Sequence, residues 1–207
     1  MKEKSWLIAN PIPNSLASCN KDLNGGYGTW DVIGKSFFSK FLAYSKKKNI
    51  KIPILCLAYI TSILEAKGLK TFYSEDINYC INLVEHKNIE GCIVYGSIVC
   101  CEHENYFIKK LKSINSKIKI FVVGTFPTKF PEKFKNADHI IIGEPEKFFL
   151  DWDGNINFFK TASQKINSEI INNLDILPIA NFNQMQSNNF SYRPMLKKPT
   201  GFIESSR

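Results

Sequence analysis

The sequence predicts an α/β protein with a parallel sheet of five strands covered by helices on both faces. Five apolar, β-prone runs alternate with segments of helical periodicity, which is typical of parallel sheets. The third and fourth runs are almost continuous in isoleucine, valine and phenylalanine, as expected when both faces of a strand are buried. The runs span residues 6–9, 70–74, 91–99, 118–123 and 139–142. We therefore expect a Rossmann-like, flavodoxin-like sheet.

The connections between these runs carry helix signals. The segment that begins at Pro53 ends at Gly68, and proline at the start with glycine past the end is the asymmetry of a helix. The next connection has Asp76 or Asn78 as a candidate cap for a short amphipathic helix. Apolar residues over 107–114 keep the same helical spacing after the third strand.

One connection is unusually long, because about forty residues separate the first strand from Pro53 where two to six are common. It contains the glycine-rich run 24–28 and then an amphipathic stretch that includes Val32, Ile33, Phe37, Phe41 and Tyr44. The glycines do not have GxGxxG spacing and no helix follows them directly. A flexible surface loop and a phosphate cradle both remain open.

The chain divides into two parts in this interpretation. Residues 1–150 form the α/β domain. After a turn at 151–155, residues 156–160 are expected to form one strand of a small hairpin, and the prolines beyond Leu174 indicate a linker.

The net charge of +8 favours an anionic partner, but only two of the 27 basic residues are arginines, which makes nucleic acid an improbable one. The lysine run at 46–48 is expected to be a solvated helix end. The first apolar run is too short for a signal peptide or a membrane span, so we expect a cytoplasmic protein without a membrane partner.

Six cysteines are present, and most lie in apolar runs. No pair has CxxC spacing, so buried reduced thiols are expected rather than disulfides or a zinc site. Cys100 and His103 lie three residues apart, but nothing else supplies a second ligand pair, and no metal ligand is predicted.

Two turns after predicted strands have distinctive sequences. The fourth strand ends in Gly124-Thr125-Phe126-Pro127 and is followed by Pro131-Glu132, and the fifth ends in Gly143-Glu144-Pro145-Glu146. These turns resemble those of the cobalamin-binding domain that precedes the catalytic domain of radical S-adenosylmethionine (SAM) enzymes. That family has a Gly-Gly-Pro-His-Pro-like turn, a Pro-Glu pair and a Gly-Glu-x-Glu turn. The order and the spacing of these motifs both match.

The tail extends the resemblance. Leu174-Asp175-Ile176-Leu177-Pro178 is similar to the linker that follows such domains, and residues 201–207 are similar to the strand that leads to the cluster-binding cysteines. The resemblance implies a downstream radical SAM domain, absent from these 207 residues, that holds a [4Fe–4S] cluster and SAM. It implies a methyltransferase or a related radical-transfer enzyme, whose reaction this segment alone does not perform.

Two departures bear on the cofactor. Thr125 replaces the second glycine of the fourth-strand turn, which narrows the space for a cofactor tail. The AspxHisxxGly motif that supplies an axial histidine in methionine-synthase-like proteins is absent. Cobalamin is the cofactor that the resemblance implies, and the alternative is an interaction domain that keeps the fold without a cofactor.

Candidate cofactor-binding residues follow the strands, because ligands of open parallel sheets bind beyond the carboxyl ends of the strands. They are Asn10, Pro11, Asp76, Ser97, Gly124, Thr125, Gly143 and Glu144. Gly124 would admit a nucleotide tail beside the hydroxyls of Ser97 and Thr125. Each of these residues also has a structural alternative that remains open. Gly124 can be a turn residue, the Ser97 hydroxyl can be bonded within the chain, and Glu144 can cap the next helix. No catalytic residue is predicted.

Two rival functions have less support. A phosphoacceptor domain needs an acidic pair after the first strand and an aspartate after the third, where Asn10 and Ser97 stand instead. A flavodoxin-like electron carrier needs a hydroxyl-rich phosphate loop after the first strand, and residues 11–16 are a poor one.

Overall fold

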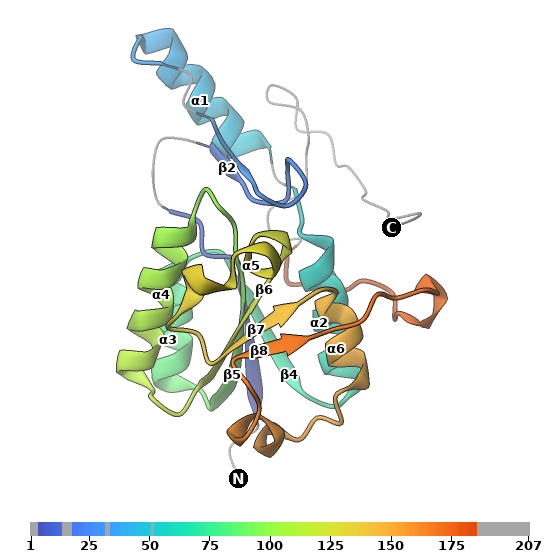
Figure 1. The fold of residues 1–207 in the computed structure, drawn as a ribbon. Coiled ribbons are helices and arrows are strands. Elements are labelled where there is room, and N and C mark those ends of the chain that lie inside the picture. The colour runs from blue at the N-terminus through green and yellow to red at the C-terminus, as the bar shows by residue number, and fades with distance from the viewer. Residues whose placement is uncertain (1–3, 14–17, 32–33, 51, 186–207) are drawn as a thin grey trace.

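The central sheet has six parallel strands. In the computed structural model, which describes residues 4–13, 18–31, 34–50 and 52–185, their order is β4-β1-β5-β6-β7-β8 (Figure 1). The strands are β1 Ser5–Ala9, β4 Lys70–Ser74, β5 Ile89–Tyr95, β6 Lys119–Val123, β7 His139–Ile142 and β8 Lys165–Asn167. The predicted α/β class is confirmed, and the first five strands have the flavodoxin-like order. The third predicted strand is shorter than expected and ends at Tyr95.

The sixth strand corrects the prediction of five. β8 pairs with β7, and backbone hydrogen bonds from Ile140 N to Gln164 O (2.6 Å) and from Ser168 N to Ile142 O (2.7 Å) hold its two ends. Residues 156–160, predicted as a hairpin strand, instead form the 3₁₀ helix η2 Ile156–Lys160. Phe159 in η2 is buried among the apolar residues of the sheet, so the core extends beyond residue 150.

Helices cover both faces of this sheet (Figure 1). They are α2 Leu55–Ala66, α3 Ile77–His86, α4 Cys101–Ile114, α5 Thr125–Lys129 and α6 Pro145–Asp151, with 3₁₀ turns at η1 Pro131–Phe134 and η3 Leu174–Ile176. Asp76 caps α3 as predicted, since its Oδ1 accepts from Asn78 N at 2.8 Å. In the described part of the chain, no helix has the length and apolar character needed to span a membrane.

The strand β1 shows how the two faces are built. Its side chains alternate, so that Leu7 and Ala9 pack in the core beneath α3 and α4. Trp6 and Ile8 pack on the other side with residues of α2 and α6. Because all five residues of β1 are buried, this strand lies at the centre of the molecule.

The long connection after β1 forms an antiparallel hairpin and a helix. The strands β2 Ser18–Asn20 and β3 Thr29–Asp31 pair, and α1 Phe37–Asn49 follows them. Figure 1 shows the hairpin above the edge at which the strands of the sheet end, with α1 projecting away from the body. The glycine-rich run is the turn of this hairpin, in which Gly26 and Gly28 are buried while Asn24 and Gly25 are exposed. Val32 and Ile33 lie outside the described residues.

The packing of Trp6 generates a stability prediction. Gly91 on β5 lies against its indole, and a Cβ at Gly91 would be 2.7 Å from two of the ring carbons. We expect Gly91→Ala to lower the free energy of unfolding by about 1–3 kcal/mol, because the rigid ring must move out of a filled core. Chemical denaturation measures the change. The control is Ser116→Ala at an exposed turn, and equal stability of the two variants would contradict this packing.

Candidate functional site

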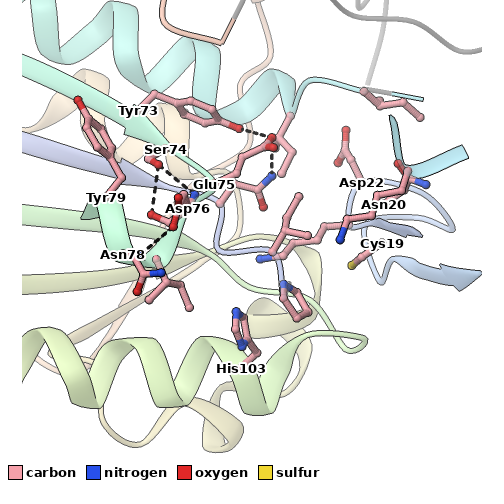
Figure 2. A pocket seen from close by; sticks show the side chains of 18 of the residues that line it. Cys19, Asn20, Asp22, Tyr73, Ser74, Glu75, Asp76, Asn78, Tyr79 and His103 are labelled. Atoms are coloured by element: carbon pink, nitrogen blue, oxygen red, sulfur yellow. Dashed lines mark hydrogen bonds between the residues drawn. The ribbon is translucent and has the colours of Figure 1, made fainter. Parts of the chain in front are cut away.

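The candidate site is a cavity at the carboxyl edge of the sheet. From β1 the chain passes first to β4 on one side and then to β5 on the other, so the crevice beyond β1 is the topological switch point where ligands of such sheets bind. A cavity of about 1040 Å³ lies there. The loops after β1 and β4, the first turns of α3 and α4, the hairpin and the residues that follow α1 line it (Figure 2).

The wall formed by β1 and β4 presents a buried polar cluster. Asn10 is 3% exposed, its backbone N–H donates to Ser74 O at 2.9 Å, and its Nδ2 lies 3.5 Å from Glu75 Oε1. Tyr73 Oη donates to the same carboxylate oxygen at 2.9 Å, as Figure 2 shows. Burial and the charge of Glu75 hold the pKa of Tyr73 well above its usual value, so the phenol stays protonated. Asn10 Oδ1 is buried and has no hydrogen-bond partner among the described residues.

The opposite wall comes from the first turn of α4. His103 lines the cavity from this helix, and its Nε2 is likewise buried without a hydrogen-bond partner in the described part of the structure. Burial, and then the charge of Lys21, lower the pKa of His103, so its imidazole is neutral near pH 7. Two residues that line one cavity from different elements therefore each have a buried polar atom without a partner among the described residues, and buried polar groups normally have partners.

A buried ion pair fixes the hairpin to the edge of the sheet. Lys21 Nζ lies 2.8 Å from Glu104 Oε1, and neither side chain is exposed to solvent. The ammonium also donates to Tyr95 O at 3.2 Å, while Ser97 donates to the carboxylate through its N–H and its hydroxyl at 3.0–3.1 Å. The charges are thus compensated and hydrogen-bonded, as a dry environment requires.

The predicted site residues separate into three groups, and the first lies at the cavity. Asn10 and Asp76 line it, and Pro11 is buried directly after Asn10. Asp76 also serves as the cap of α3. Lys47 lines the cavity as well, so the lysine run at 46–48 is not only a solvated helix end as expected.

The second group lies beneath the hairpin. Ser97 is fully buried and its hydroxyl donates to Glu104. This is the structural alternative given for Ser97 above. Gly124 has φ 123° and precedes α5 as a turn residue. The hairpin packs against Thr125, the residue after Gly124, because a Cβ on Gly26 would lie 2.5 Å from Thr125 Oγ1. The hairpin therefore enters the crevice expected to admit a nucleotide tail, while Thr125 stays exposed.

The third group lies beyond β7 and fastens the segment after β8. A Cβ at Gly143 would collide with the Ser168 carbonyl oxygen. Ser168 Oγ donates to Glu144 O at 2.5 Å, and Ile171 N donates to Glu144 Oε2 at 2.8 Å. Gly143 and Glu144 do not line the cavity, and this carboxylate anchors a loop instead of capping α6.

The sequence did not single out Lys21 or Glu104. Both are charged residues in polar surroundings, and their pairing depends on the fold of the insertion. The position of His103 in the first turn of α4 was a signal that could have identified it as a site residue. The metal site considered for His103 and Cys100 is not supported. Within the described ranges, no group of three or more histidine, cysteine or acidic side chains could hold a metal.

Comparisons with protein-family models, curated proteins and solved structures gave no match.

The ion pair generates a second prediction. In Lys21→Met the Glu104 carboxylate stays buried without its counter-charge, so the free energy of unfolding should fall by about 3–5 kcal/mol. The double variant Lys21→Met/Glu104→Gln should recover part of that loss, because no uncompensated charge remains. Urea denaturation measures both. Lys147→Met, in an exposed pair with Asp151, is the control and should change stability by less than about 1 kcal/mol. A similar loss in the single and double variants would argue against a compensated pair.

Proposed function

We propose that this chain is a cobalamin-binding-type domain of a radical SAM enzyme and that the corrinoid occupies the cavity at the switch point. The observation that carries the proposal is the cavity of about 1040 Å³ at this edge, which Asn10 and His103 line from opposite walls. Each of the two residues also has a buried polar atom without a partner in the described part of the chain. The order and spacing of the motifs at Gly124 and Gly143 support the choice of cofactor.

The chemistry of the cavity suits a ligand that carries carboxamides. A primary carboxamide offers two N–H donors and one carbonyl acceptor. It can satisfy Asn10 Oδ1 through an N–H and His103 Nε2 in either tautomer. The corrin ring of cobalamin is fringed with such amide side chains, so the donors and acceptors of cavity and ligand match.

The hairpin occupies part of the crevice beside Gly124. Gly26 contacts Thr125 there, and Ser97 is already bonded to Glu104. We therefore assign the ligand to the cavity lined by Asn10, Asp76 and His103, and not to the crevice that the resemblance implied.

The residues of this chain would bind and shield the ligand, while bound cobalamin supplies methyl-carrier chemistry. Asn10 and His103 would orient the amides of the ring. The hairpin and the end of α1 would cover the cavity and limit the access of water. The [4Fe–4S] cluster and SAM belong, in this proposal, to a separate radical SAM domain.

A second candidate function is an interaction domain with this fold and no cofactor. Two observations favour it. The hairpin enters the crevice beside Gly124, and α1 exposes its aromatic side chains, with Phe37 88%, Phe38 65% and Phe41 52% exposed. Exposed apolar side chains that gather on one element are typical of protein contacts.

An absorbance measurement separates the two functions. The purified chain is mixed with hydroxocobalamin and passed through a gel-filtration column, and the corrinoid spectrum should travel with the protein. Protein that carries no corrinoid at any concentration tested would leave the interaction domain as the better assignment.

The same measurement tests the assigned cavity. His103→Leu removes one polar partner and should weaken binding about 2- to 10-fold, the effect of one hydrogen bond. His86→Leu, on the exposed end of α3, is the matched control and should bind like the parent. Equal affinity of both variants would place the ligand elsewhere on the domain.

A further inference from the structure

Two cysteines from distant parts of the chain meet beside the cavity. Cys19 on β2 and Cys100 at the start of α4 are 81 residues apart in sequence, and their sulfur atoms lie 2.9 Å from each other. Both thiols are free and both residues are buried. A disulfide has a sulfur–sulfur distance of about 2.05 Å, so a shift of less than about 1 Å would join them.

The two thiols have different electronic surroundings. Cys100 precedes the first turn of the 14-residue helix α4, and helix N-termini and nearby cations stabilise thiolates. The hydrogen bond that it shares with Cys19 and the charge of Lys21 lower the pKa of Cys100, against the effect of burial. The same hydrogen bond and burial raise the pKa of Cys19. Cys100 is thus the stronger nucleophile, and Cys19 holds its proton beside it.

A small molecule has a route to this pair. Cys19 is 9% exposed and lines the cavity, whereas Cys100 is 2% exposed behind it. This arrangement admits a peroxide more readily than a bulky thiol reagent. A low-pKa thiol next to a second cysteine is the pattern of a redox-sensitive pair.

We propose that Cys19 and Cys100 form a redox-modification site that a peroxide converts into a disulfide. The Cys100 thiolate attacks one peroxide oxygen, the O–O bond breaks, and Cys100 becomes a sulfenic acid as hydroxide leaves. The Cys19 sulfur then attacks the Cys100 sulfur, the S–O bond breaks, and the proton of Cys19 leaves with the hydroxyl as water. Two thiols and one hydrogen peroxide give one disulfide and two waters, so that the thiols are oxidised and the peroxide is reduced.

The disulfide between Cys19 and Cys100 would link the β2–β3 hairpin covalently to the start of α4. At present β2 is held there by non-covalent contacts, among them the pair of Lys21 with Glu104. A disulfide from β2 to the start of α4 would fix the hairpin over the carboxyl edge of the sheet. The inference does not depend on the identity of the ligand in the cavity.

Mass spectrometry of the parent protein tests the proposal directly. The full chain is reduced, freed of reductant, treated with hydrogen peroxide while folded, then denatured and alkylated. Two of its six thiols should escape alkylation until dithiothreitol is added, and peptide mapping should link Cys19 to Cys100. Hydrogen exchange at the amides of β2 and β3 should be slower in the oxidised form.

Variants identify the roles of the two sulfur atoms. Cys19→Ser should leave Cys100 as a sulfenic acid that dimedone traps, because the resolving thiol is missing. The matched control is Cys101→Ser, which removes the adjacent thiol and should still yield the Cys19–Cys100 link. A link between another pair, or oxidation of the folded parent to sulfinic acid without a disulfide, would overturn the proposal.

Discussion

The buried ion pair of Lys21 and Glu104 joins the β2–β3 hairpin to the parallel sheet and its helices. One partner belongs to a hairpin that a parallel sheet does not need, and the other to the helix that follows the central strand β5. Charges taken out of water are stable only when they are matched and hydrogen-bonded, and Ser97 together with the Tyr95 carbonyl completes the set. The pair therefore specifies where the hairpin sits as much as it contributes to stability.

The position of the hairpin decides which part of the carboxyl edge is open. Over β5 and β6 the hairpin contacts Thr125 through Gly26, whereas over β1 and β4 it lines a cavity. Asn10 and His103 line this cavity. Many binding proteins share this sheet topology. Here the inserted hairpin lines a cavity at one side of the carboxyl edge.

Most of the sheet could be predicted from the sequence because buried strands such as β5 and β6 are continuous apolar runs, and that signal is local. The strand β8 escaped prediction because Lys165 and Asn167 flank a single apolar residue, and pairing with β7 supplies what its composition lacks. The cavity was harder to predict, because it depends on contacts between distant segments of the chain. The turns at Gly124 and Gly143 are visible in the sequence, but the segments that cover them come from residues far away in the chain.

The three tryptophans of this chain lie in places that make them optical probes of different parts of the structure. Trp6 and Trp152 are buried together, with ring centroids 5.1 Å apart, and report on the core beneath α6. Trp30 is on β3 and is 36% exposed. With phenylalanine at positions 6 and 152, the tryptophan fluorescence of the protein would come from the hairpin alone, and its emission would report on the position of that hairpin over the cavity without an added label.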